Sequence, residues 1–596
     1  MDSKNWILKD GFRDGIVNVL CVLLLAVYPL RHVGVGVDLM DGGYNYANFL
    51  YGSMEYMDSM WYFATWIANH AGALLMKLPG GGTMLGMNIY IGFFVSLLAS
   101  AGFLFCTKVL KLPAVWALLG ELTACSLCWA PTAVLYNYLT YLFLLGGSLF
   151  LYRALTGGRK LCFVAAGVLL GLNVGVRFSN LVQAAMILIV WGYALLSRKS
   201  WRETVRETLL CMLGYLGAVG CFLALMSLRY GFGEYLAGIL RLFQMTETAT
   251  DYSPGGMLFN VFKAYWECGY WLKRFLLVLA LELGICLILP KSWEKAKKAL
   301  CLLVTVAFGF WLTAHNYFAA NYITYDTIYY PCVMVLLAAY GFSLFFLIKR
   351  GTAPEERLPA LFVLLTLFVT SLGSNNGVYS CFNNLFLALP FFLHMLRSFC
   401  REQRAVAAFP LKTLTAAAVL ILFVQAAGFG LNFVYEEATG GVAMEYRVQG
   451  IPVLEGMKTD REKAEQLTEL YTYLENEGLR ENKILLYGQI PGLAYYLEME
   501  PALNIWSDLR SYSAEVMEAD MAQLRQKAET EGELPVLVLE REWAEYLDAP
   551  EKAAAYWDET AVGKLALIRE LAEDFSYERV FQNEKYAVYS AGGTGQ

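Results

Sequence analysis

Long apolar runs separated by short polar segments are the most regular feature of the chain. Runs of roughly 17 to 25 apolar residues suit an α-helix that crosses about 30 Å of hydrocarbon. The pattern predicts thirteen spans, at residues 15–31, 83–106, 112–131, 134–154, 161–177, 180–197, 207–228, 275–290, 299–315, 328–348, 358–373, 378–396 and 411–434. Beyond residue 434 charged residues become frequent, and short helix and strand signals alternate.

This charged C-terminal region, residues 435–596, is called the tail below. DREKAEQLTELYTYLENEG predicts an amphipathic helix capped by Asp460. KILLYG and LPVLVLE predict buried strands, and YERVFQNEKYAVYS predicts a terminal hairpin. We therefore predict an all-α polytopic membrane domain over 1–434 and an α/β domain over 435–596. The tail has no glycine-rich phosphate loop and no nucleophile elbow, which leaves acceptor recognition, a lid and a structural cap open as its role.

The distribution of Lys and Arg predicts the orientation in the membrane. Every even-numbered span is followed by a basic segment, such as TKVLK, RALTGGRK or SRKSWRETVRE, whereas opposite loops such as APTAV, HNYFAANYITYD and LGSNNGV carry almost no positive charge. Basic loops face the cytoplasm. We therefore expect an integral protein of a bacterial plasma membrane, with a cytoplasmic N-terminus and an extracytoplasmic tail. Two outer loops are long, 32–82 and 229–274, and the second is amphipathic and aromatic enough to lie in the interface.

Composition supports the membrane interpretation. The chain is 58% hydrophobic, 15% aromatic and only 16% charged, and its mean hydropathy is +0.46, well above soluble averages. A net charge of −6 does not suggest a nucleic-acid partner. The 13 cysteines lie almost entirely in apolar segments, where cysteine acts as a small packing residue. Cys125 and Cys128 form a CxxC without further soft ligands, which favours packing over zinc.

Two acids stand just past the first span, in VGVDLMDGGYNYANF. An ionised carboxylate close to hydrocarbon is costly, so Asp38 and Asp41 are either solvated loop acids or a general base held in a cavity at the membrane edge. Spacing alone does not decide between the two.

A wider stretch, DLMDGGYNYANFLYGSMEYMDSMWYF, resembles the first outer loop of GT-C-type glycosyltransferases. The likeness is to the branch that contains protein O-mannosyltransferases and bacterial aminoarabinose transferases. Asp41 matches the first acid of that motif, Tyr44 its tyrosine and Asp58 its second acid.

The sequence also departs from that motif. Gly42 stands where the family has Glu, Met57 where it has Arg, and ANHAGALL replaces a Pro-Pro segment. His70 is a candidate for the histidine of the family. The missing Glu leaves the need for a divalent cation open, and we predict no defined metal site and no other cofactor.

The resemblance implies a GT-C-like bundle that transfers a sugar from a polyprenyl-phosphate donor to an extracytoplasmic lipid, glycan or protein acceptor, with inversion. Asp41 would be the general base, supported by Asp38 or Asp58. Proton removal by a positioned carboxylate contributes about 10² to 10⁴ in rate, and cations would stabilise the leaving phosphate.

Candidate cations and amides lie on the predicted outer side. Arg177, in NVGVRFSNL, is a phosphate ligand or an Arg that reaches lipid headgroups. Arg241 in the second long loop and Lys77 after the first are further candidates. Asn375 and Asn376, in SLGSNNGVYS, bind sugar or phosphate oxygens or serve ordinary turn chemistry.

Two other classes of function stay open. A transporter or lipid flippase would need polar groups along a path through the membrane, and Glu121 and Glu282 lie within spans. A non-catalytic scaffold would use the membrane part only to present the tail. The polar residues gather on the outer side, which favours interfacial chemistry.

Overall fold

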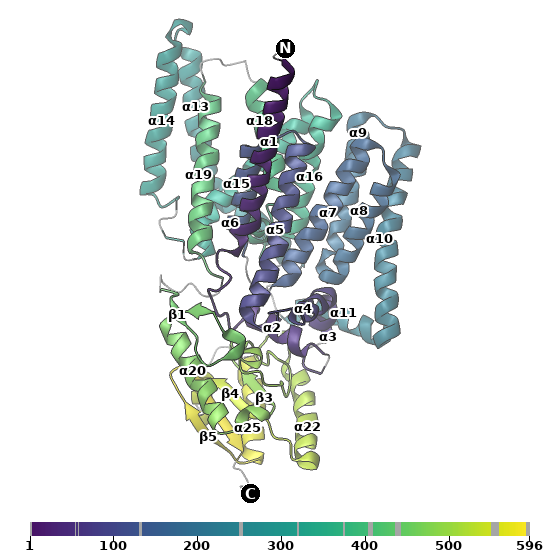
Figure 1. Cartoon of the computed structure of the whole chain (residues 1–596), viewed down its shortest axis with the longest axis vertical. Helices are drawn as coiled ribbons and strands as arrows, with labels where there is room; N and C mark the ends of the chain where they lie inside the picture. The colour runs from purple at the N-terminus through teal and green to yellow at the C-terminus, as the bar shows by residue number, and fades with distance from the viewer. Residues whose placement is uncertain are drawn as a thin grey trace.

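The computed structural model describes residues 3–53, 55–57, 59–129, 134–248, 254–318, 321–322, 324–372, 376–402, 409–435, 443–549 and 559–591. Long helices run side by side along the molecule, with the N-terminus at one end of this bundle and the tail at the other (Figure 1). The bundle consists of α1 (Ser3–Val27), α5 (Met84–Lys108), α6 (Ala114–Leu127), α7 (Leu135–Gly157), α8 (Lys160–Val176), α9 (Leu188–Ser197), α10 (Trp201–Tyr230), α13 (Gly269–Ile288), α14 (Glu294–Ala314), α15 (Tyr329–Ile348), α16 (Pro354–Ser371), α18 (Ala388–Glu402) and α19 (Leu411–Asn432).

The bundle is that of an integral membrane protein. Within the described ranges, seven helices are long and apolar enough to cross a membrane, and three shorter apolar helices accompany them. Each of the thirteen predicted spans coincides with a helical segment. The number of spans and their alternation across the membrane stay predictions.

Glycines let α8 pack closely on α10. A Cβ on Gly167 would lie 1.9 Å from the carbonyl oxygen of Cys211, and one on Gly214 would lie 2.1 Å from that of Val164. Only glycine permits this approach, which is the way small residues pack membrane helices. The first half of α8 is therefore in close backbone contact with α10.

A 3₁₀ segment, η2 (Phe178–Ile187), interrupts the path from α8 to α9. Runs of 3₁₀ helix beyond three or four residues are uncommon, so this length needs support from side chains. Arg177 stands at the break in an extended conformation, with φ −151° and ψ 123°.

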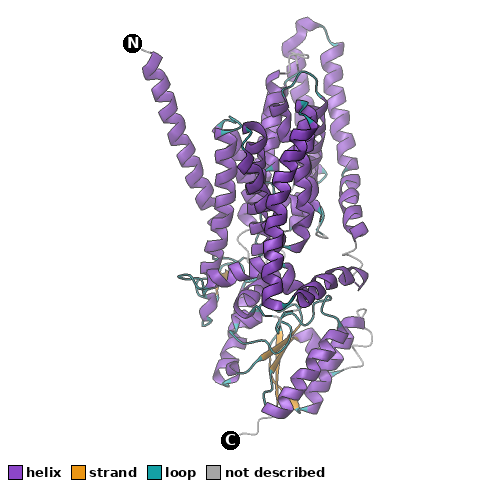
Figure 2. Ribbon diagram, turned by 90° about the vertical axis from the view of Figure 1, so that its right-hand side faces the viewer, coloured by secondary structure: helices purple, strands orange, loops and turns teal. Residues whose placement is uncertain are grey.

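Short helices lie between the bundle and the tail (Figures 1 and 2). The first long loop forms α2 (Asp41–Tyr51), α3 (Ser59–Ala64) and α4 (Trp66–Met76). The second forms α11 (Phe232–Thr248) and α12 (Pro254–Glu267). Near the same end lie η1 (Tyr28–Leu30), η5 (Tyr325–Ile328) and α17 (Tyr379–Asn383), whereas η4 (Lys291–Trp293) joins α13 to α14.

The tail is a mixed α/β unit. Its four-stranded sheet has the order β3 (Ile484–Tyr487), β4 (Val536–Glu540), β6 (Tyr586–Ala591), β5 (Tyr577–Gln582), with β3 parallel to β4 and the β5–β6 pair antiparallel. A two-stranded pair joins β1 (Tyr446–Arg447) to β2 (Lys458–Thr459). The helical parts are η6 (Pro452–Leu454), α20 (Arg461–Asn476), η7 (Leu479–Glu481), α21 (Leu493–Tyr496), α22 (Ala514–Glu531), α23 (Arg541–Asp548) and α25 (Glu559–Asp574).

These elements confirm the local predictions for the tail. Both predicted strands and the terminal hairpin form. Asp460 caps α20 by accepting a hydrogen bond from the backbone N–H of Lys463 at 2.9 Å. Where the membrane domain ends and the tail domain begins stays a prediction.

The tail docks on the first long loop through backbone contacts. Gly36 N–H donates to Lys458 O at 2.8 Å, and Gly492 N–H donates to Leu39 O at 2.9 Å. One apolar cluster runs without interruption through bundle, loop and tail. Tyr46 on α2 and Tyr495 on α21, for example, stack with ring centroids 5.1 Å apart.

Candidate functional site

Asp41 stands at the first position of α2, after a turn that Asp38 organises. The Asp38 carboxylate accepts hydrogen bonds from the backbone N–H groups of Met40, at 2.7 Å, and Gly42. These are donors that a helix N-terminus would otherwise leave without an intrahelical partner. In the sequence Asp-x-x-Asp, the carboxylate of Asp38 thus accepts backbone hydrogen bonds, and Asp41 stands at the start of the helix.

The Asp41 carboxylate contacts a side chain that follows the last helix of the bundle. Tyr435 O–H donates to Asp41 Oδ2 at 2.8 Å, and the Tyr435 ring stacks on Trp129 with centroids 5.0 Å apart. Burial raises the pKa of Asp41 above its usual range, and the hydrogen bond from Tyr435 offsets part of that rise. A carboxylate with a raised pKa is a stronger base than an exposed one.

Asp41 and Arg177 line one small cavity of about 70 Å³. They come from segments 136 positions apart, at the start of α2 and at the end of α8. The other lining residues are Trp129, Tyr136, Asn137, Thr140, Tyr141, Ser179, Asn180, Gln183, Val369, Thr370, Leu372, Asn376, Ser380, Asn383, Asn384 and Tyr435. The cavity is therefore rich in hydroxyl and amide groups and holds one carboxylate and one cation among its described residues.

Arg177 brings a positive charge to the cavity. Its guanidinium lies 5.2 Å from the centroid of the Tyr136 ring, a cation–π contact. Within the described part of the chain, no carboxylate forms a salt bridge with Arg177. Its charge is therefore available to an anion in the cavity.

A buried amide network holds the backbone around Arg177. Asn173 donates through Nδ2 to Thr140 O at 3.0 Å and to Gln183 Oε1 at 2.7 Å. Asn180 donates through Nδ2 to Thr140 Oγ1 at 2.7 Å, and Gln183 donates back to Asn180 Oδ1 at 3.1 Å. These bonds tie α7, α8 and η2 together, which explains how the long 3₁₀ segment is supported.

The opposite wall is fixed by Asn383. Its Oδ1 accepts a hydrogen bond from the backbone N–H of Trp129 at 2.9 Å, and its Nδ2 donates to the hydroxyl oxygen of Tyr141 at 2.8 Å. Asn383 thereby links α17 to the end of α6 and to α7. Asn376, one of the two predicted turn amides, lines the same cavity, whereas Asn375 lies outside the described residues.

The other predicted residues lie in different places. Tyr44 packs its ring against Trp506 of the tail at 5.4 Å. His70 stacks on Trp66 at 3.8 Å and bonds through Nδ1 to Trp66 O at 2.9 Å, and burial lowers the pKa of His70. Neither is among the described residues that line the Asp41 cavity.

Three further predicted residues complete the comparison. Lys77 is an exposed residue at the C-terminal end of α4. Arg241 on α11 lines a separate, wider cleft. Asp58 lies outside the described residues, so its predicted supporting role stays a prediction.

Sequence reasoning missed two residues of the site, Tyr435 and Trp129. Tyr435 is the first residue of the predicted tail, and Trp129 lies at the end of an apolar run, so each looks like an ordinary interfacial aromatic. Their pairing with Asp41 depends on contacts across hundreds of residues, and no local pattern signals it.

The described donor set does not make a site for a divalent ion. Among the residues that the structure describes, no group of three or more His, Cys, Asp or Glu side chains is placed to hold a metal. The cavity supplies one carboxylate, Asp41, whereas Mg²⁺ and Ca²⁺ take several oxygen ligands.

No protein-family model and no curated protein matches this chain. Solved structures do resemble it. The oligosaccharyltransferase of Archaeoglobus fulgidus, in complex with Zn and sulfate, is 12% identical with a TM-score of 0.46, over 96% of this chain and 73% of that one. AglB from the same organism, in complex with an inhibitory peptide and a dolichol-phosphate, is 12% identical with a TM-score of 0.45, over 98% of this chain and 74% of that one.

ArnT from Cupriavidus metallidurans, bound to undecaprenyl phosphate, gives 12% identity and a TM-score of 0.42 over 99% of both chains. AglB and ArnT are glycosyltransferases of the GT-C class, and ArnT is an aminoarabinose transferase.

Proposed function

We propose that this chain is a membrane glycosyltransferase that moves a sugar from a polyprenyl-phosphate donor to an acceptor outside the cytoplasm, with inversion. The observation that carries the proposal is the shared cavity of Asp41 and Arg177. In this cavity a partly buried carboxylate, with its pKa raised, lies beside a cation that forms no salt bridge with any described carboxylate. A base and an anion site are the two groups that displacement of a lipid phosphate requires.

The chemistry follows from these two groups. Asp41 takes the proton from the acceptor hydroxyl or amine as that atom attacks the anomeric carbon of the donor. The bond between that carbon and the phosphate oxygen breaks, and the phosphate leaves with the electron pair. Arg177 faces the leaving phosphate and stabilises its charge through its planar fork of N–H groups. Attack from the side opposite the phosphate inverts the configuration.

The remaining polar groups would orient the sugar. Amides and hydroxyls such as those of Asn376, Asn384 and Ser380 line the cavity and both donate to and accept from sugar hydroxyls.

Transfer by the purified protein tests the proposal. The protein in lipid nanodiscs is given defined polyprenyl-phosphate sugars with a labelled sugar, and a membrane glycan and lipid extract as the acceptor source. We expect Asp41→Asn to lower kcat by about 10² to 10⁴. Asp574→Asn, an exposed carboxylate of the tail, is the matched control and should leave transfer unchanged. Full transfer by Asp41→Asn would remove Asp41 as the base.

A further inference from the structure

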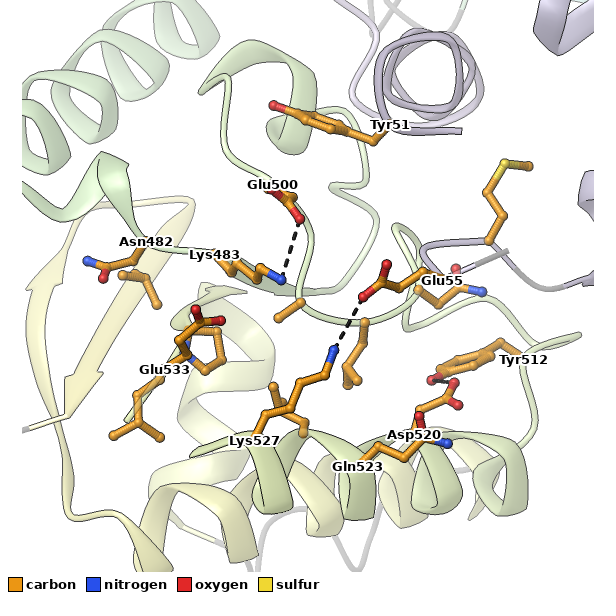
Figure 3. Close-up of a pocket in the computed structure, with 18 of the residues that line it drawn as sticks. Tyr51, Glu55, Asn482, Lys483, Glu500, Tyr512, Asp520, Gln523, Lys527 and Glu533 are labelled. Atoms are coloured by element: carbon orange, nitrogen blue, oxygen red, sulfur yellow. Dashed lines mark hydrogen bonds and ion pairs between the residues drawn. The ribbon is translucent and has the colours of Figure 1, made fainter. Parts of the chain in front are cut away.

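A second cleft lies between the far end of α2, the interfacial helix α11 and the tail. Its volume is about 1160 Å³, far larger than the Asp41 cavity. Tyr51 and Glu55 of the first loop form one wall, Glu234 of α11 another, and α22 with the start of β4 the third. Figure 3 shows the side chains of Glu55, Lys483, Glu500 and Lys527 converging in this space.

The charge of the cleft is unbalanced. It is lined by seven carboxylates and four cations: Glu55, Glu234, Glu481, Glu498, Glu500, Asp520 and Glu533, against Arg241, Arg480, Lys483 and Lys527. The cations have partners: Lys527 pairs with Glu55 at 3.3 Å, Lys483 with Glu500 at 3.4 Å and Arg480 with Glu498 at 3.4 Å. Arg241 donates through Nη1 to Ser59 Oγ at 3.5 Å.

Four carboxylates of the cleft form no salt bridge with a described residue. Glu234, Glu481, Asp520 and Glu533 form no salt bridge with any described residue, although Asp520 accepts a hydrogen bond from Tyr512 O–H at 2.7 Å. The groups of the cleft that can still bind a ligand are therefore mainly negatively charged hydrogen-bond acceptors. A polyanionic ligand would meet repulsion there.

A buried amide also faces the cleft. Asn504 lines it and is only 6% exposed. Its Oδ1 accepts from the backbone N–H of Trp506 at 2.9 Å, but its Nδ2 has no hydrogen-bond partner among the described residues. Nδ2 is therefore a donor that a ligand oxygen in the cleft can use. Gln523 and Asn482 add exposed amides to the same lining.

We propose that this cleft binds a hydroxyl- and amine-bearing oligosaccharide. Sugar hydroxyls both donate and accept, which matches a lining of carboxylates and amides. Protonated amines match the unpaired carboxylates. The inference rests on the proposed function for the role of that ligand, which is the glycan acceptor.

The position of the cleft sets the form of the acceptor. Asp41 begins α2 and Tyr51 ends it, so the cleft and the base are separated by 11 residues of helix, or roughly 15 Å at 1.5 Å per residue. A glycan that occupies the cleft while its reactive end reaches Asp41 is longer than a monosaccharide. Because α11 lines the cleft, such a chain can extend from the membrane surface.

Binding to the full chain tests the inference without requiring transfer. The protein in nanodiscs of zwitterionic lipid is titrated by calorimetry with three tetrasaccharides. They are the tetramer of glucosamine, the neutral tetramer of N-acetylglucosamine and the tetramer of galacturonate. Tetralysine serves as a peptide probe of equal charge. We expect the glucosamine tetramer to bind about tenfold more tightly than the neutral one, and galacturonate to bind more weakly than both. Tighter binding of galacturonate, or binding of tetralysine equal to that of the glucosamine tetramer, overturns the proposal.

Matched variants locate the site. Glu533→Gln and Asn504→Ala should each weaken binding of the glucosamine tetramer by about tenfold. Glu518→Gln removes an exposed charge from the same helix α22 outside the cleft and should leave binding unchanged. Equal weakening by Glu518→Gln means diffuse adsorption and overturns the proposal. Asp41→Asn should bind the tetramer normally, so that failure of the transferase proposal is distinguishable from failure of the cleft.

Discussion

The hydrogen bond between Tyr435 and Asp41 gives a direct test of the base. In Tyr435→Phe the donor to Asp41 Oδ2, at 2.8 Å, is lost, while the ring that stacks on Trp129 at 5.0 Å remains. Tyr435 is 9% exposed, so water replaces the lost hydroxyl poorly. The substitution therefore changes the electrostatics of the carboxylate with little change in packing.

The sign and size of the effect follow from the chemistry. A hydrogen bond to a charged group contributes about 1.5–3 kcal/mol, and this one stabilises the ionised form of Asp41. Burial already raises the pKa of Asp41, and removal of Tyr435 O–H raises it further. Activity requires the ionised carboxylate, so it is lost as pH falls through that pKa. The acid limb of the pH–rate profile should move to higher pH in Tyr435→Phe.

The assay is kcat/KM for sugar transfer measured across pH for both proteins. Tyr90→Phe is the control, because Tyr90 O–H donates to Pro79 O at 2.7 Å, away from the cavity, and its profile should match that of the native protein. An acid limb that stays in place, or that moves to lower pH, refutes the assignment of Asp41 as the titrating base.

Three further predictions follow from the structure. Arg177→Ala should raise KM for the donor by more than about tenfold, and Arg177→Lys should recover part of it because the charge stays while the fork is lost; initial rates measure both. Gly43→Ala should destabilise the docked tail by about 1–3 kcal/mol, since its Cβ would lie 2.5 Å from Gly492 Cα. Denaturation reports this loss, and Gly217→Ala, with open space around it, should show none. Glu121→Met should raise Tm, because both carboxylate oxygens of this fully buried residue lack hydrogen-bond partners among the described residues, at a cost of about 1–3 kcal/mol.

Hydrophobic pattern predicts most of the helical architecture. Apolar runs of membrane length became helices because hydrocarbon leaves the backbone no other partners. The break between α8 and α9 was placed by pattern, but its 3₁₀ geometry was not. It depends on amides of Asn173, Asn180 and Gln183 that meet only after folding, and period alone carries no information about such contacts.

The site was predictable to a smaller extent. Asp41 and Arg177 stand out in sequence because each carries charge where charge is costly, and the structure brings both to one cavity. Asp38 stands out for the same reason, yet its carboxylate accepts backbone N–H bonds at the start of α2, for which we propose a positioning role. The two cases differ only in which donors lie nearby, and spacing does not reveal that.

The tail contacts the turn that precedes Asp41. Tyr496 O–H donates to Asp38 O, and Gly492 N–H donates to Leu39 O at 2.9 Å. Both bonds hold the turn that leads into α2. Because a shift of about 1 Å in a catalytic group costs large factors in rate, docking of the tail sets the geometry of Asp41. The position of the proposed base and the docking of the tail therefore depend on the same interface.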